Sequence, residues 1–164
     1  MNDNKLLKIF QSAVKSKILA GDIDKYLCDW RGVYKGNTKF VIFPQTTLEV
    51  SKIVKLANKF NIPIVPQGGN TGLCGGATPD KSGNSILINL SKLNKIRSID
   101  LLGNTISVEG GCVLETILNE TDKNDRVFPI NLAAKGSCTI GGNLATNAGG
   151  INVLKYGLTL SLIH

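Results

Sequence analysis

The sequence has few aromatic residues, and this shortage narrows the functions that it can carry. Aromatic residues make up 5% of the 164 positions, and none is grouped on a basic stretch. Binding of single-stranded nucleic acid depends on aromatic side chains that stack on bases beside a basic surface. The formal net charge is +7, from 19 basic and 12 acidic side chains, but the lysines are scattered along the chain. We therefore predict no nucleic-acid partner.

Histidine is nearly absent too, and the cysteines stand far apart. The one histidine is His164, and the four cysteines form no C-x-x-C pair. Zinc sites need clusters of such ligands, so no metal site is predicted. Ser137 and Cys138 lack a histidine base nearby, which argues against a nucleophilic triad. We predict no catalytic residue within this chain, and we expect reduced thiols in a cytoplasmic protein.

The chain contains neither a secretory signal nor an apolar run of the roughly 20 residues that a membrane span requires. Its first 20 residues instead show apolar side chains every four positions, at Leu6, Phe10, Val14 and Ile18. This spacing is typical of one face of a helix. We predict an N-terminal helix that docks on the body of the protein.

A strand, a helix and a second strand are predicted from residue 39 onward. Lys39–Phe43 is a short apolar run, and Ile62–Val65 is another. Between them, Thr46 and Glu49 have the spacing of a capping box, in which Thr46 accepts from the Glu49 amide and Glu49 reaches back. The helix should run to about Phe60, because apolar residues follow at helical spacing. Short links make this a βαβ unit with parallel strands.

The remaining elements are predicted from alternation and turn signals. Two strands around Gly103-Asn104 read as a hairpin, and a helix follows Gly110-Gly111. The segment Leu158–Ile163 resembles the approach to another strand. The full set is a surface loop at 22–36, a strand at 85–89, hairpin strands at 95–100 and 105–109, the helix after 111, and a short helix within 136–150. We predict an α+β fold.

Two glycine-rich stretches carry the functional signal: the first glycine segment, residues 66–79, and the second glycine segment, residues 136–150. Consecutive glycines allow the backbone to approach a ligand and to adopt positive φ, and N–H groups in such turns bind anions. The first segment follows a strand of the βαβ unit, where ligands of open α/β sheets collect. Neither G-x-G-x-x-G nor a P-loop occurs, so a different nucleotide cradle is predicted.

The residues of both segments resemble those of one family. The first reads Pro66-Gln-Gly-Gly-Asn-Thr-Gly-Leu73, with Gly75-Gly76 after it. The second reads Gly136-Ser-Cys-Thr-Ile-Gly-Gly-Asn-Leu-Ala-Thr-Asn-Ala-Gly-Gly150, with Tyr156-Gly157 after it. Together with Trp30-Arg-Gly, these motifs resemble the FAD-linked oxidase family, which has the vanillyl-alcohol-oxidase (PCMH) type of FAD-binding domain. The likeness is greatest to the group of D-2-hydroxyglutarate dehydrogenase and the glycolate oxidase D subunit.

The resemblance implies FAD as the cofactor and names residues that contact it. The first glycine segment would wrap the diphosphate, and the second would lie along the ribityl chain and the flavin ring. The implied cofactor-binding residues are Pro66, Gln67, Gly68, Gly69, Asn70, Thr71, Gly72, Gly136, Ser137, Cys138, Ile140, Gly141, Gly142, Asn143, Thr146, Asn147 and Gly149. One departure is Thr139, where similar dehydrogenases often carry histidine.

Some members of the family attach FAD through a histidine in the first segment. None occurs there in this chain, so the resemblance implies non-covalent FAD. Cys74 and Cys138 are expected to be packed residues rather than points of attachment.

The resemblance also implies a domain plan and an activity. Residues 1–36 would form an N-terminal helix and lead-in, residues 37–90 a first FAD-binding subdomain, and residues 91–164 a second subdomain that is truncated. When complete, such a protein would be a flavin-dependent oxidoreductase acting on D-2-hydroxy acids. The alternative is a non-catalytic, truncated remnant that folds but does not retain FAD. Such a remnant would form a homo-oligomer through an exposed sheet edge or pair with a separate C-terminal fragment.

Overall fold

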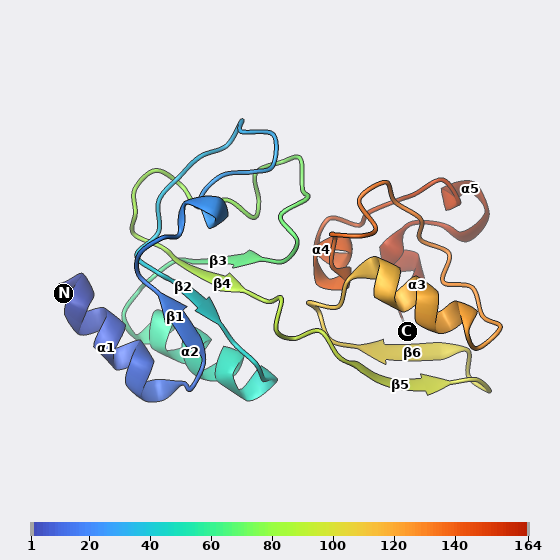
Figure 1. Cartoon of the computed structure of the whole chain (residues 1–164), viewed down its shortest axis with the longest axis horizontal. Coiled ribbons are helices and arrows are strands. Elements are labelled where there is room, and N and C mark those ends of the chain that lie inside the picture. Colours follow the sequence, from blue (N-terminus) through green and yellow to red (C-terminus); the bar gives the residue numbers. More distant parts are fainter. Residues whose placement is uncertain (1, 164) are drawn as a thin grey trace. The chain divides into compact units, whose positions relative to one another are not determined.

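The computed structural model describes residues 2–163 and divides into two compact units, Met1–Leu93 and Asn94–His164 (Figure 1). Each unit has helices and its own sheet. Among residues 2–163, no helix combines the length and the apolar character that crossing a membrane would need.

The first unit is built on a four-stranded sheet with the order β1-β2-β4-β3. Strands β2, β4 and β3 are parallel, as predicted for the βαβ unit, and β1 pairs antiparallel with β2. The two strands of the predicted βαβ unit, β2 and β3, are not paired with each other, because β4 lies between them. The elements are α1 (Asp3–Ala13), β1 (Lys17–Leu19), the 3₁₀ turn η1 (Asp24–Tyr26), β2 (Val41–Phe43), α2 (Thr47–Lys59), β3 (Ile64–Gln67) and β4 (Ile86–Asn89).

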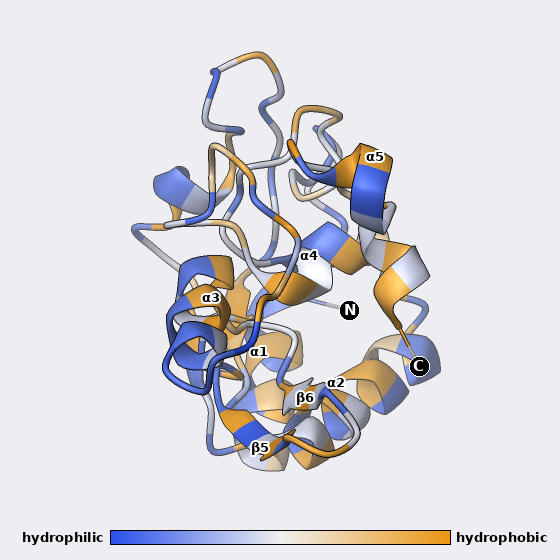
Figure 2. Ribbon diagram, turned by 90° about the vertical axis from the view of Figure 1, so that its right-hand side faces the viewer, coloured by the Kyte–Doolittle hydropathy of each residue, from blue (hydrophilic) through white to orange (hydrophobic). Residues whose placement is uncertain are grey.

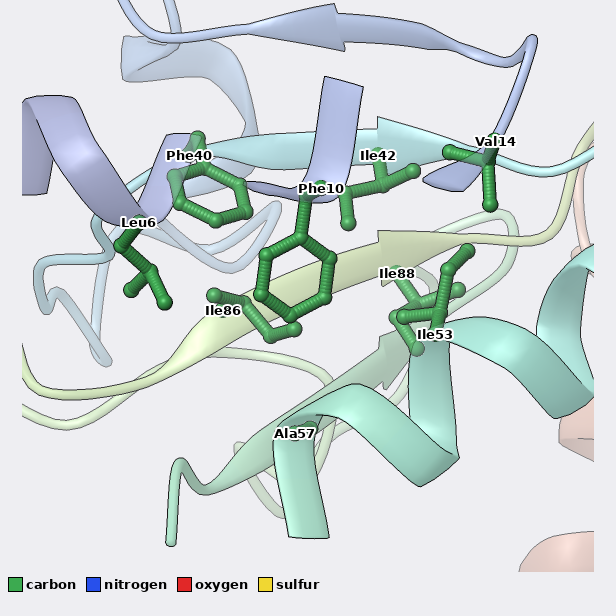
Figure 3. Close-up of a cluster of buried hydrophobic side chains, with 9 residues drawn as sticks. All are labelled: Leu6, Phe10, Val14, Phe40, Ile42, Ile53, Ala57, Ile86 and Ile88. Carbon is green, nitrogen blue, oxygen red and sulfur yellow. The ribbon is translucent and has the colours of Figure 1, made fainter. Parts of the chain in front are cut away.

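Helices α1 and α2 cover one face of this sheet. Alternate strand residues point to opposite faces, so Ile86 and Ile88 of β4 pack against the helices while Leu87 packs on the other side. Figure 3 shows Phe10 of α1 and Ile53 of α2 meeting these isoleucines in one cluster. Helix α2 carries both hydrophobic and hydrophilic residues (Figure 2), and its apolar residues Ile53 and Ala57 are buried in this cluster. Burial of this cluster provides the main stabilisation of the unit.

The N-terminal helix is confirmed, but it is shorter than the four-residue repeat predicts. Leu6 and Phe10 are buried on α1, whereas Ile18 lies in β1, opposite Ile42 of β2. The helix ends because the chain turns extended at Val14 to pair with the free edge of β2. A repeat of four residues cannot distinguish a helix from a helix followed by a strand.

The capping box is confirmed on one side only. Thr46 accepts a hydrogen bond from the Glu49 N–H at 3.2 Å, as predicted. The Glu49 carboxylate does not reach back to Thr46; it accepts from the N–H of Gln45 at 2.9 Å and from that of Lys15 at 3.0 Å. These bonds hold the pKa of Glu49 below its ordinary value of 4.5, although burial alone would raise it. Glu49 therefore ties the exit of α1 to the start of α2.

The second unit begins with the predicted hairpin, and helices follow. Its elements are β5 (Ile96–Asp100), β6 (Thr105–Val108), α3 (Leu114–Asp122), α4 (Ile140–Ala145), α5 (Val153–Tyr156) and the 3₁₀ turn η2 (Thr159–Leu162). Leu158–Ile163, which we expected to be the approach to another strand, instead contains η2. There, Thr159 donates its N–H to the carbonyl of Ala148 at 3.0 Å, which folds the segment back onto the preceding loop instead of extending it along a sheet.

Candidate functional site

The first glycine segment leaves β3 at the carboxyl ends of the parallel strands. Gln67 closes β3 beside Asn89, the last residue of β4, and the two side chains face each other at 3.4 Å. This is the edge at which open α/β sheets place their ligands. The predicted diphosphate loop thus lies where the topology favours a binding site.

The backbone N–H groups in the first half of this segment, residues 68–74, are unpaired. Among the hydrogen bonds of residues 2–163, none uses an N–H of residues 68–74. Gly69, Gly72, Leu73 and Cys74 are exposed to solvent. Backbone N–H groups are obligatory donors, so a run of unpaired ones is ready to bind an anion. The residues present therefore fit a diphosphate.

Positive φ in this segment occurs at Asn70 (53°) and at Gly75 (72°), the first of the Gly75-Gly76 pair. A Cβ placed on Gly72 would meet nothing within 4 Å. This position therefore has free space in which a larger side chain would displace a ligand bound to the segment.

The side chains of Gln67 and Asn70 bind within the protein. Gln67 is 2% exposed, and its Nε2 donates to the carbonyls of Tyr26 at 3.0 Å and Ala77 at 2.9 Å. Asn70 donates from Nδ2 to the carbonyl of Cys28 at 2.8 Å. These two predicted residues shape the segment through their side chains, which bind backbone carbonyls of the protein itself. Pro66 lies within β3 and Thr71 on the segment itself.

In the second glycine segment, which lies in the other unit, most backbone N–H groups already donate hydrogen bonds within the protein. The N–H groups of Ser137 and Cys138 donate to Ala134, that of Ile140 to Cys112, and that of Gly141 to Gly110. The N–H groups of Asn143, Thr146 and Asn147 are used inside or at the end of α4. This segment is therefore held in the second unit by backbone hydrogen bonds.

Its glycines are explained by close packing. A Cβ on Gly141 would lie 2.7 Å from the Gly110 carbonyl oxygen, and one on Gly149 would lie 2.6 Å from the Leu158 side chain. Gly142, by contrast, would place a Cβ at an ordinary 3.6 Å from Thr139. Of the predicted residues here, Gly136, Ser137, Gly142 and Thr146 are exposed.

Three predicted residues of this segment are buried: Cys138, Ile140 and Asn143. Burial raises the pKa of the Cys138 thiol. Asn143 is 4% exposed, and its Nδ2 makes no hydrogen bond. Cys138 is packed, as expected, but the same expectation for Cys74 is wrong, because Cys74 is exposed. Thr139 is buried at the start of α4.

A cavity of about 410 Å³ in the second unit runs along β6 and is lined mainly by apolar side chains. Of the predicted cofactor residues, only Ile140 lines it. Its lining contains no charged group, so it offers no positive charge to a phosphate.

Residues 26–36, here called the clamp, contact the first glycine segment, and these contacts were not predicted from the sequence. These residues were predicted as part of a surface loop, with Trp30-Arg-Gly as part of the family resemblance, but without any contact to the first glycine segment. Three of them bind that segment: the Tyr26 carbonyl accepts from Gln67, the Cys28 carbonyl accepts from Asn70, and Arg31 donates to the Leu73 carbonyl. The signal in the sequence was the cluster of Trp30, Arg31 and Tyr34. Partners some 40 residues away are not visible in local periodicity.

Known proteins were compared with the chain by sequence and by structure. A family model described as an FAD binding domain matches residues 38–164. D-2-hydroxyglutarate dehydrogenase of Xanthomonas citri is 37% identical over 161 residues, covering 97% of this chain and 34% of the relative. The mitochondrial D-2-hydroxyglutarate dehydrogenase of Arabidopsis thaliana is 37% identical over 158 residues, covering 94% of this chain and 28% of the relative. The chain spans about a third of these relatives' length or less.

Solved structures share the fold. Alkyldihydroxyacetonephosphate synthase has a TM-score of 0.83 at 20% identity, covering 96% of this chain and 34% of that protein. The 6-hydroxy-D-nicotine oxidase of Arthrobacter nicotinovorans has a TM-score of 0.75 at 24% identity, covering 90% of this chain and 32% of that protein. These likenesses concern the fold, and they confirm the predicted α+β class.

Proposed function

This chain belongs to the family of FAD binding domains, and from that premise we propose that residues 68–72 bind the diphosphate of FAD. The observation that carries the proposal is the run of unpaired, partly exposed N–H groups in the first glycine segment. A diphosphate offers several charged oxygens, and hydrogen bonds to charged groups are stronger than those between neutral ones. Pro66 and Gln67 lead into this run and fix its start.

The second glycine segment contributes in a different way in this proposal. Its exposed positions, Gly136, Ser137, Gly142 and Thr146, supply the surface that contacts the rest of the cofactor. Its buried members, Cys138, Ile140 and Asn143, support that surface from inside the unit. Gly141, Asn147 and Gly149 set the backbone path between them.

The whole protein to which this domain corresponds is proposed to oxidise D-2-hydroxy acids. The support is that the two relatives described above are D-2-hydroxyglutarate dehydrogenases and that nearly all of this chain matches them. A bound flavin accepts a hydride from the substrate carbon in such chemistry. The residues of this chain bind and orient the cofactor, and we assign none of them to the substrate.

We propose that FAD binds without a covalent link. The only histidine of the chain is residue 164, and the first glycine segment contains none. Burial raises the pKa of Cys138, which makes its thiolate scarce at neutral pH. Denaturation in acid should therefore release all FAD into the supernatant, whereas yellow colour retained in the precipitated protein would overturn this part of the proposal.

Titration with FAD tests the proposal directly. The single tryptophan, Trp30, lies in the clamp beside the first glycine segment, so energy transfer to bound flavin should quench its emission. Gly72→Val should weaken binding at least tenfold, because it fills the open side of the segment, while the fold is unchanged.

Gly76→Val is the matched control. A Cβ on Gly76 also meets nothing within 4 Å, and it lies in the same segment outside residues 68–72. Its affinity for FAD should equal that of the wild type. Equal binding by all three proteins, or no saturable quenching in the wild type, would contradict the proposal.

A further inference from the structure

The clamp gives the first glycine segment its shape through a chain of contacts that begins at a buried carboxylate. Asp29 is 4% exposed and accepts from the N–H of Tyr34 at 2.8 Å, while Arg31 approaches its other oxygen at 3.5 Å. Burial alone would raise the pKa of Asp29, but the N–H groups of Tyr34 and Val33, and then Arg31, hold that pKa below its ordinary value. Asp29 therefore stays charged and fixes the Arg31 guanidinium.

We propose that Asp29 and Arg31 are positioning residues for the FAD site, holding the first glycine segment in the open form whose N–H groups are unpaired. The inference rests on the proposed function, because it concerns the same donors. Arg31 belongs to the Trp30-Arg-Gly motif of the family resemblance, but the resemblance assigned a cofactor role to neither residue.

Arg31 acts on the segment through a backbone carbonyl. Its guanidinium donates to the carbonyl oxygen of Leu73, while Leu73 itself is 56% exposed. In a trans peptide the C=O and the following N–H point in opposite directions. Holding the Leu73 carbonyl toward the clamp thus turns the N–H of Cys74 away from it. The bond from Asn70 to the Cys28 carbonyl anchors the segment three residues earlier.

A third contact closes the same arrangement. The ring of Tyr34 lies on Gly75, where a Cβ would be 2.8 Å from the ring carbon Cγ. The far end of the segment is held as well, because a Cβ on Gly36 would lie 1.8 Å from the carbonyl oxygen of Pro79. The clamp therefore contacts the segment along its whole length within the first unit.

Positioning is needed because an open run of donors is costly to maintain. Unpaired N–H groups favour any conformation that pairs them, and a glycine-rich backbone has many such conformations. If only a fraction of molecules holds the open form, the apparent dissociation constant rises by the inverse of that fraction. Loss of one charged hydrogen bond at Arg31 is therefore expected to weaken FAD binding about tenfold.

The test compares Arg31→Gln with Lys39→Gln. Lys39 is in the same unit and forms an ion pair with Asp3 of α1 at 2.8 Å, so each variant removes one positive charge and one ion pair. Two quantities are measured: FAD affinity from Trp30 quenching, and the rate at which thermolysin cleaves before Leu73 without FAD, identified by mass spectrometry.

Arg31→Gln should bind FAD about tenfold more weakly and be cleaved faster before Leu73, whereas Lys39→Gln should match the wild type in both measurements. Arg31→Lys keeps a donor for the Leu73 carbonyl and should recover part of both losses. Should Arg31→Gln fail to fold, Arg31→Lys and Asp29→Asn provide the same comparison with milder changes.

The outcomes separate the two proposals. Wild-type affinity and a wild-type cleavage rate in Arg31→Gln would overturn the positioning role while leaving FAD binding intact. Failure of the wild type to bind FAD would contradict the proposed function, and the cleavage rates would still decide whether Arg31 holds the segment. Faster cleavage in Lys39→Gln to the same degree would also overturn the positioning role, because it would show a general effect of charge.

Discussion

The two glycine segments look alike in the sequence and differ in the structure. In the first, the N–H groups of residues 68–74 are unpaired, and a Cβ at Gly72 or Gly76 would meet open space. In the second, most N–H groups bond within the unit, and Gly141 and Gly149 sit where a side chain would clash with the protein itself. Glycine thus leaves open space in one place and permits close packing in the other. Composition alone does not separate the two uses.

The largest effect is expected from a methyl group at Gly150. A Cβ there would lie 2.1 Å from the backbone oxygen of Asn131, which cannot move aside as a flexible side chain would. Gly150→Ala should lower the free energy of unfolding of the second unit by about 3 kcal/mol or more. Hydrogen exchange of the amides in α3 measures this loss.

The matched change in the first segment is Gly72→Ala. It should leave the stability of the first unit within about 0.5 kcal/mol of the wild type, because the added methyl group meets nothing. Thermal unfolding followed by Trp30 emission reports on that unit. Equal losses from Gly72→Ala and Gly150→Ala would erase the contrast between the segments.

A smaller effect is expected at Asn143, whose buried Nδ2 makes no hydrogen bond. A buried amide without a partner costs free energy, so Asn143→Leu should raise the stability of the second unit by about 1 kcal/mol. Chemical denaturation with far-UV circular dichroism measures it. A loss of stability would contradict this prediction. A loss of FAD binding at unchanged stability would mean that the second segment also offers a hydrogen-bond donor to FAD, which would weaken the contrast between the two segments.

The smallest effect concerns pH. In the second unit, the N–H of Lys95 and then Arg97 hold the pKa of Glu109 below its ordinary value of 4.5, although burial opposes them. The folded-state pKa is lower than the unfolded one, so this stabilisation is complete above pH 4.5 and is lost as the pH falls through the folded-state value.

Glu109→Gln should therefore flatten the acid side of the stability profile of the second unit. Glu115→Gln, a change of the same charge on α3, serves as the control. Hydrogen exchange of α3 amides at stepwise lower pH makes the measurement. Identical profiles for wild type and Glu109→Gln below pH 4.5 would show that the carboxylate contributes nothing.

The sequence predicted the local elements well, because each has a local signal. The capping residue Thr46, the alternating strands around Gly103-Asn104 and the helix after Gly111 are all found, and the family resemblance is confirmed by the match to FAD binding domains. What failed depended on distant partners. Ile18 continues a helical repeat but pairs with Ile42, and Leu158–Ile163 resembles the approach to a strand but contains the turn η2.

The candidate site shows the same limit. The first glycine segment was recognisable by its residues, but the contacts of the clamp were not, because Arg31 and Leu73 are 42 positions apart and the Trp30-Arg-Gly motif does not say which carbonyl Arg31 binds. The internal roles of Gln67, Asn70 and Gly141 were likewise hidden, since a motif lists residues without saying which atoms face a ligand.

The most direct measurement follows the amide resonances of the ¹⁵N-labelled chain during addition of FAD, ADP or riboflavin. The account predicts that the amides of residues 68–72 shift with FAD and with ADP, which both carry a diphosphate, and not with riboflavin, which lacks one. The amides of Ser137, Cys138, Ile140 and Gly141, already bonded within the protein, should shift less. Binding of FAD that leaves the amides of residues 68–72 unmoved would contradict the account at its centre.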